Sequence, residues 1–119
     1  MRGMGLWIDD ARKPNALPGE VWIHVTTKEA FIDVIQNNRI TLVSLDFDLH
    51  RPFDGNFYTG EGIAKWLIEN LPECVDDIMI HSSFPEGCIK IGNVLDKCPK
   101  LRRQNGGWYS RIRGVSSVG

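Results

Sequence analysis

The run from Ile40 to Leu45 is the most apolar, β-branched segment of the chain, and it restricts the possible fold more than any other feature. Such a run predicts a strand that is buried on both faces, as in sheets covered by helices on either side. Shorter apolar runs at 6–8, 21–25 and 77–80 have the same character. We therefore predict a sheet of about four strands.

Three segments with helical spacing of apolar residues alternate with these strands. We expect helices over 30–35, from Thr59 or Gly60 to Pro72, and over 87–98, with Thr27 as the N-cap of the first. Strands that alternate with helices predict right-handed βαβ units and a mostly parallel sheet. The expected architecture is a three-layer α/β domain.

The length of 119 residues and the hydrophobic content of 42% fit one domain with a modest core. We place this domain at 6–98, after a native lead-in or an expression remnant over 1–5. The segment 52–60 is expected to form a loop long enough to act as a lid. Residues 99–119 are expected to form a basic, aromatic C-terminal tail, either solvated or in contact with another subunit.

Charge and cysteine content exclude several classes of partner. With 14 Lys+Arg against 15 Asp+Glu, neither a nucleic-acid backbone nor a membrane is expected as a bulk partner. The cysteines Cys74, Cys88 and Cys98 are odd in number and widely spaced, which predicts reduced thiols. The sequence has neither the roughly 20 apolar residues of a membrane span nor a signal-peptide core. We expect a soluble, cytoplasmic protein.

Acidic residues follow two of the predicted strands: Asp9 and Asp10 come after the first, and Asp46 and Asp48 after the run that ends at Leu45. Ligands of open parallel sheets bind beyond the carboxyl ends of the strands, so these acids converge on one crevice if the strands are neighbours. Closely packed carboxylates need a cation or a shared proton. Their oxygen atoms suit Mg²⁺ or Mn²⁺.

Asp10 and Asp46 are the preferred ligands, with Asp9 and Asp48 next. Adjacent residues of an extended segment point to opposite sides, so at least one residue of each pair should face away from the crevice. The alternative interpretation is that these acids cap helices or form ion pairs with neighbouring arginines, namely Arg12 and Arg51.

His81 follows the strand predicted at 77–80 and is a candidate general acid or base, although a lone strand histidine is more often a hydrogen-bonded core residue. Ser82 is expected either to bind a phosphate or to cap the turn. Helix N-termini near Thr59 and Gly87 offer free N–H groups to an anion. Together these features predict phosphoryl or phosphodiester chemistry.

Four motifs in series resemble the cyclic-phosphate-processing receiver-like domains. They are Trp7-Ile-Asp-Asp-Ala-Arg-Lys-Pro14, Val43-Ser-Leu-Asp-Phe-Asp-Leu49, Thr59-Gly60 before Trp66-Leu67, and Ile80-His-Ser-x-x-Pro85-x-Gly87. The resemblance covers residues 6 to about 95. It implies a shortened flavodoxin-like receiver fold that binds or hydrolyses a cyclic nucleotide or cyclic phosphate. In ordinary receivers an acidic pair holds Mg²⁺ and a later aspartate accepts a phosphoryl group, and Asp9, Asp10 and Asp46 or Asp48 match these places.

The chain departs from both patterns. Family members usually carry an asparagine where this chain has Phe84, which removes a polar contact with the substrate. No fifth strand with the receiver lysine follows the third helix, which argues against phosphorelay signalling. The arginine-rich segment offers replacements, with Arg102 or Arg111 for the phosphate and Trp108 or Tyr109 for stacking on a base.

These observations predict a metal-assisted phosphodiesterase whose partner is a small cyclic nucleotide or cyclic phosphate. The candidate residues are His81, Asp46 and Asp48 for catalysis, Asp9, Asp10 and Asp46 for Mg²⁺ or Mn²⁺, and Arg12, Ser82, Thr59 and Gly60 for the substrate. Two alternatives stay open. One is a non-catalytic module that sequesters a cyclic nucleotide, and the other is a degenerate receiver that acts as a protein-interaction domain.

Overall fold

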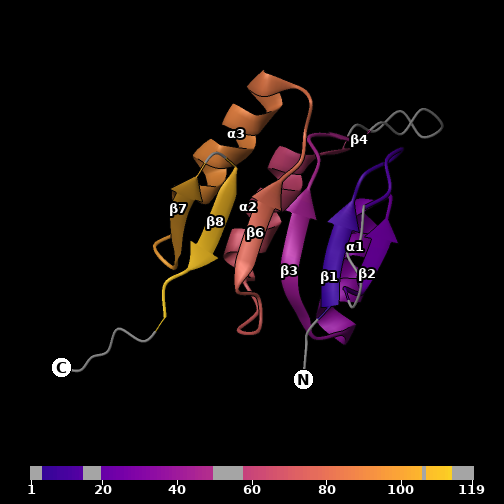
Figure 1. Ribbon diagram of the computed structural model, residues 1–119, viewed down its shortest axis with the longest axis horizontal. Helices are drawn as coiled ribbons and strands as arrows, with labels where there is room; N and C mark the ends of the chain where they lie inside the picture. Colours follow the sequence, from indigo (N-terminus) through magenta and orange to yellow (C-terminus); the bar gives the residue numbers. More distant parts are fainter. Residues whose placement is uncertain (1–3, 15–19, 50–57, 106, 114–119) are drawn as a thin grey trace.

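A six-stranded sheet in the order β2-β1-β3-β6-β8-β7 forms the centre of the molecule (Figure 1). The computed structural model describes residues 4–14, 20–49, 58–105 and 107–113. The strands of this sheet are β1 (Met4–Ile8), β2 (Trp22–Val25), β3 (Ile40–Leu45), β6 (Asp77–Ile80), β7 (Leu101–Asn105) and β8 (Trp108–Arg111). A separate two-stranded ladder joins β4 (Asp48–Leu49) to β5 (Tyr58–Thr59).

The described residues form three helices, which cover one face of the sheet and lie behind it in Figure 1: α1 (Lys28–Asn37), α2 (Gly60–Glu69) and α3 (Pro85–Leu95). Helix α1 meets α2 through the rings of Phe31 and Trp66, which pack edge to face, and α2 packs along α3. The strand side chains beneath these helices are fully buried, namely Leu6, Ile8, Val43, Leu45 and Ile78. The described residues therefore form two layers, which corrects the predicted three.

The second face of the sheet has no helical cover from the described residues. Residues 9–14 and 20–21, which lie between β1 and β2, contain no helix, and β8 follows β7 directly as a hairpin. A helix in the first of these connections would be needed to cover this face. Leu42 and Met79 on the uncovered side are consequently only half-buried. The expectation that Ile40–Leu45 is buried on both faces is therefore wrong at Leu42.

The sheet is mixed, with six strands rather than about four parallel ones. Strands β1, β2, β3 and β6 are parallel, whereas β8 runs antiparallel to β6 and β7 antiparallel to β8. Residues 101–105 and 108–111, expected in the C-terminal tail, thus belong to the sheet. The segment from Arg102 to Asn105 is exposed and carries no alternating apolar pattern. The Asn105-Gly106 dipeptide in the sequence is nevertheless a hairpin signal.

Several local predictions are confirmed. Thr27 accepts a hydrogen bond from the backbone N–H of Ala30, and Thr59 accepts one from that of Gly62, so both residues cap their helices. The three cysteines are free thiols.

Two boundaries differ from the prediction. Strand β1 begins inside the expected lead-in, and α3 ends at Leu95 because residues 96–97 turn toward β7.

Two further expectations concern a lid and a membrane span. Of the expected lid at 52–60, residues 52–57 lie outside the described residues, and the remainder forms β5 and the start of α2. No helix in the described part of the chain is both long and apolar enough to cross a membrane.

Candidate functional site

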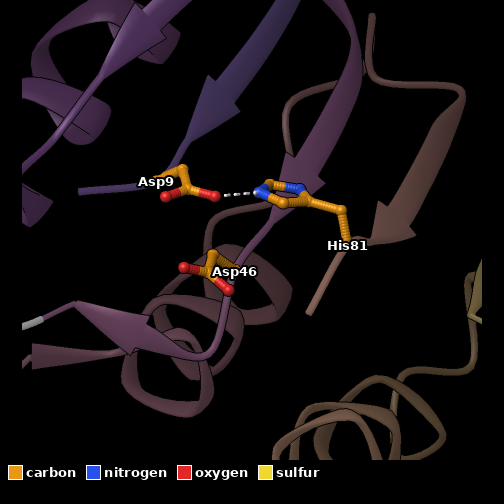
Figure 2. Close-up of side chains that lie close together, drawn as sticks. All are labelled: Asp9, Asp46 and His81. Atoms are coloured by element: carbon orange, nitrogen blue, oxygen red, sulfur yellow. Dashed lines mark hydrogen bonds and ion pairs between the residues drawn. The ribbon is translucent and has the colours of Figure 1, made fainter. Parts of the chain in front are cut away.

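The carboxyl ends of three neighbouring strands bring Asp9, Asp46 and His81 together. Each residue directly follows its strand, β1, β3 or β6, and each backbone N–H continues the parallel ladder, to Val25, Ile8 and Leu45 respectively. One ligand atom from each side chain lies within 4.8 Å of the other two. Figure 2 shows Asp9 and His81 pointing toward each other with Asp46 beside them. We refer to these three residues as the acid–histidine cluster.

The direction of these side chains follows from strand periodicity. Leu6 and Ile8 are fully buried under the helices, so Trp7 and then Asp9 point to the uncovered face. The register pairs Trp7 with Ser44 and Ser44 with Met79, so these three residues form one row across the sheet. Each cluster residue lies two positions further along the chain than the member of this row on its own strand. The cluster therefore opens onto the helix-free side of the sheet.

Asp9 is the most firmly held member of the cluster. Its Oδ1 accepts hydrogen bonds of 2.8 Å from the backbone N–H groups of both Ala11 and Arg12. Its Oδ2 lies 3.1 Å from Nε2 of His81 and 3.3 Å from Nε of Arg12. Burial alone would raise the pKa of Asp9, but these hydrogen bonds and nearby positive charges outweigh it and lower the pKa below its ordinary value. Asp9 is thus an anion at neutral pH.

Asp46 is in the opposite electrostatic situation. Its side chain is buried, and burial together with the negative charge of Asp9 raises its pKa from 3.8 to about 6. The Nη2 of Arg12 stands 3.6 Å from Oδ1 of Asp46 and offsets part of this rise. The carboxyl group therefore gains and loses its proton close to neutral pH.

His81 is held between Ser44 and Trp7. Its Nδ1 lies 2.6 Å from the hydroxyl of Ser44, which is fully buried, and its ring stacks on the indole of Trp7 with 3.6 Å between centroids. Burial is the main reason why its pKa falls to about 4, although the charge of Asp9 opposes the fall. The neutral ring donates from Nε2 to the Asp9 carboxylate, so Nδ1 accepts from the Ser44 O–H.

Arg12 crosses the open side of the cluster. It makes ion pairs with Asp9 and Asp46, and its Nη2 donates a 3.0 Å hydrogen bond to the carbonyl of His81. Its side chain is 53% exposed, so the guanidinium can reach a ligand from solvent. These pairs agree with the alternative interpretation of the acids at Arg12, whereas Arg51 lies outside the described residues.

The structure separates Asp10, a preferred ligand in the sequence prediction, from this cluster. Asp10 is exposed and lies outside the acid–histidine cluster, although its charge is a minor cause of the raised pKa of Asp46. The backbone of Asp48 is part of β4, but its side chain lies outside the described residues. Asp9 rather than Asp10 thus accompanies Asp46, because Asp9 shares the strand face of Trp7.

The three predicted substrate contacts besides Arg12 have structural partners. The hydroxyl of Ser82 accepts a hydrogen bond from the N–H of Phe84 and closes the turn before α3. Thr59 caps α2. Gly60 packs so tightly on the backbone of Asp46 that an added Cβ would lie 2.1 Å from its carbonyl oxygen. Contact of these residues with a substrate stays a prediction.

Sequence reasoning missed two residues that orient His81, namely Ser44 and Trp7. Ser44 is one of the two hydroxyl residues in the apolar β3 run and stands two positions before Asp46, so it points to the same face. Trp7 has the same relation to Asp9. This two-residue offset from each acid is the signal that would have identified both.

Comparison with known proteins identifies the family of the chain. No curated protein matches the chain. The sequence model of the cyclic-phosphate processing receiver domain matches residues 4–97, a span that runs from β1 into the turn after α3 and includes every cluster residue. With this match over more than half of its length, the chain belongs to the cyclic-phosphate processing receiver domain family.

Proposed function

We propose that the protein is a metal-assisted phosphodiesterase that opens a cyclic phosphate to a phosphomonoester. The observation that carries this proposal is the acid–histidine cluster, which gathers two carboxylates and an imidazole beside an exposed arginine. Its position at the carboxyl edge of parallel strands is where α/β sheets bind ligands.

The donor set of the cluster fits a divalent cation. Asp9 and Asp46 would supply carboxylate oxygens, and Nε2 of His81 would supply a third donor atom. The imidazole favours Mn²⁺ over Mg²⁺, because Mg²⁺ prefers oxygen ligands. When bound, such a cation acts as a Lewis acid that polarises the phosphate.

Ser44 would help His81 to serve as a ligand. Nε2 must be free of its proton before it can bind a cation, so the single proton of the neutral ring must move to Nδ1. The Ser44 hydroxyl can accept from a protonated Nδ1 as readily as it donates to a bare one. The same hydrogen bond therefore supports both tautomers of His81.

Arg12 and Asp46 are suited to act on the phosphate itself. The exposed Arg12 guanidinium can exchange its carboxylate contacts for two phosphate oxygens. Asp46 would accept the proton of the attacking water through the one of its two oxygens that does not bind the cation. The water oxygen bonds to phosphorus, the bond to the ring oxygen breaks, and that oxygen takes the proton from Asp46.

The test is product analysis of 2′,3′-cyclic and 3′,5′-cyclic mononucleotides incubated with the protein and Mn²⁺, Mg²⁺ or a chelator. We expect metal-dependent formation of a phosphomonoester, and a loss of at least about a hundredfold in kcat for Asp46→Asn. Asp33→Asn, at an exposed position of α1, is the matched control and should behave as the parent protein. Equal turnover by Asp46→Asn and the parent would refute the proposal.

One observation favours a second candidate, a module that binds a cyclic nucleotide without cleaving it. Both ring nitrogens of His81 already have partners, and Arg12 already pairs with the two carboxylates. A site whose polar groups satisfy one another can hold a phosphate without activating water. Stoichiometric binding, with the cyclic ligand recovered intact in the presence of Mn²⁺, would favour this candidate.

A further inference from the structure

The uncovered face of the sheet carries a depression of 580 Å³. Its walls include three tryptophans from three strands, namely Trp7 of β1, Trp22 of β2 and Trp108 of β8. Leu42 and Met79 contribute aliphatic surface between them. The volume lies within the range of about 300–1,000 Å³ that is typical of small-molecule sites, and the walls are mainly apolar, as in such sites.

Two residues that line the depression, Trp7 and Arg12, also contact the acid–histidine cluster. Trp7 lines the depression and also stacks on His81. Arg12 lines it as well and pairs with Asp9 and Asp46, while the indole N–H of Trp7 donates to the Arg12 carbonyl. A ligand with its phosphate at Arg12 therefore has the aromatic depression directly beside it.

The aromatic wall is fixed by packing. The Trp22 ring lies across Gly5, where an added Cβ would stand only 2.5 Å from the ring. The rings of Trp7 and Trp22 meet edge to face, with 5.8 Å between centroids and 88° between planes. Trp22 also donates a hydrogen bond to Glu20. Trp108, by contrast, is 36% exposed and presents its ring to solvent.

We propose that this depression binds the base of a nucleoside cyclic phosphate, with Trp108 as a stacking residue. The inference rests on the proposed function and narrows its substrate class from cyclic phosphates to cyclic nucleotides. Tryptophan faces bind flat aromatic rings, and base stacking changes affinity about fivefold to a hundredfold or more. Arg12 and Lys13 line the same depression and place positive charge beside it for the phosphate.

Trp108 comes from a part of the chain that the family match does not cover. It belongs to β8, outside residues 4–97 that match the family, whereas the cluster lies inside that span. The β7–β8 hairpin thus adds an aromatic wall to the receiver sheet. Tyr109, the other aromatic residue considered for stacking, faces the helices, where its hydroxyl contacts Gly92 and Asp96.

The test compares adenosine 2′,3′-cyclic phosphate with methyl riboside 2′,3′-cyclic phosphate, which has the same cyclic phosphate but no base. Binding is measured by calorimetry with and without Mn²⁺, and turnover is measured in parallel. Variants are Trp108→Ala, Trp108→Phe and Trp66→Phe, the last on the helix side as a control. We expect the parent to bind the nucleotide at least tenfold more tightly than the riboside.

Trp108→Ala should remove most of this preference and leave the riboside affinity unchanged, whereas Trp108→Phe and Trp66→Phe should retain it. Equal affinities of the parent for both ligands would overturn the inference, even if both were hydrolysed and the proposed function stood. If Trp108→Ala loses the preference for the nucleotide and the parent protein hydrolyses neither ligand, the base-binding inference would be supported and the proposed hydrolase activity refuted. Self-association through this face, with no binding of either ligand, would also overturn the inference.

Discussion

The imidazole of His81 stacks on the indole of Trp7 with ring centroids 3.6 Å apart and planes inclined by 12°. Trp7 lies near the carboxyl end of β1 and His81 follows the carboxyl end of β6, so the two meet in space although 74 positions separate them in a chain of 119. The stack leaves the two ring nitrogens of His81 directed along its plane, one at Ser44 and the other at Asp9. Packing on the sheet face thus fixes the orientation of a candidate ligand.

Ser44→Ala is expected to weaken Mn²⁺ binding about tenfold to a hundredfold, the range found when a group that orients a ligand is removed. The substitution leaves Nδ1 of the buried His81 ring without its 2.6 Å partner. Titration with Mn²⁺ by calorimetry measures the effect. Ser83→Ala, on the exposed loop after β6, should bind Mn²⁺ as the parent does. Unchanged affinity in Ser44→Ala would contradict a role of this hydroxyl in ligation.

Metal binding should depend on pH through Asp46. Its pKa of about 6 means that a cation must displace a proton below this pH, so the apparent affinity should fall about tenfold per pH unit there. Above pH 7 the affinity should be nearly constant. Mn²⁺ titrations between pH 5 and 8 test this, together with proton release measured in two buffers of different ionisation enthalpy. A pH-independent affinity across this range would contradict the assignment.

His81 should make stability depend on pH in the metal-free protein. Its folded pKa of about 4 lies below the unfolded value of 6.5, so its contribution is complete above pH 6.5 and is lost as the pH falls toward 4. The full loss is at most about 3 kcal/mol. Asp46 acts in the opposite sense, because its folded pKa is raised and ionisation costs stability as the pH rises from 3.8 to about 6.

These two contributions can be separated by comparing Asp46→Asn with the double variant Asp46→Asn/His81→Gln. Without the Asp46 titration, the difference in unfolding free energy between them should shrink as the pH is lowered from 7 to 4. Urea denaturation at each pH measures it. A difference that stays constant over this range would show that His81 is not held in its neutral form.

Phe84 occupies the N-cap of α3 with extended backbone angles but makes no side-chain cap hydrogen bond. Its exposed fraction is 46%, and its ring contacts Phe47. Asparagine is a strong N-cap residue and alanine is a poor one, and neither keeps the ring contact. Phe84→Asn should therefore be about 1 kcal/mol more stable than Phe84→Ala. Equal melting temperatures of the two variants would exclude this cap.

The structure also gives a reason for the asparagine that the sequence resemblance led us to expect at this position. An asparagine at the N-cap of α3 would stabilise the helix by accepting a hydrogen bond from its first turn, independently of any contact with the substrate. Turnover by Phe84→Asn distinguishes the two roles, since a cap changes stability alone.

The parallel half of the sheet was predictable because each of its strands carries its own apolar run and polar stop. The strands of the hairpin were not predictable, since Arg102 to Asn105 show no alternation and the hairpin is held by pairing with β6; only its turn has a sequence signal, Asn105-Gly106. At the site, the convergence of Asp9, Asp46 and His81 followed from strand ends. The membership of Asp9 rather than Asp10 could not be predicted, because Leu6, Trp7 and Ile8 are all apolar and so do not indicate which face of β1 the helices cover.

Gly60 joins the fold to the site, because the first residue of α2 rests on the backbone of Asp46. An added Cβ would lie 2.1 Å from the Asp46 carbonyl oxygen, and main-chain atoms cannot yield as a flexible side chain can. Gly60→Ala should cost about 1–3 kcal/mol in unfolding free energy and should also weaken Mn²⁺ binding by displacing Asp46.

Gly62, one half-turn further along α2, is the matched control for this prediction. The nearest atom to an added Cβ there is 4.0 Å away, so Gly62→Ala should be neutral or stabilise the helix by up to about 1 kcal/mol. Urea denaturation and Mn²⁺ titration of both variants separate the effects of helix propensity and close packing. If Gly60→Ala matched Gly62→Ala in both measurements, the contact with Asp46 would have no part in shaping the site, and a direct role of Gly60 toward the substrate would become the better explanation.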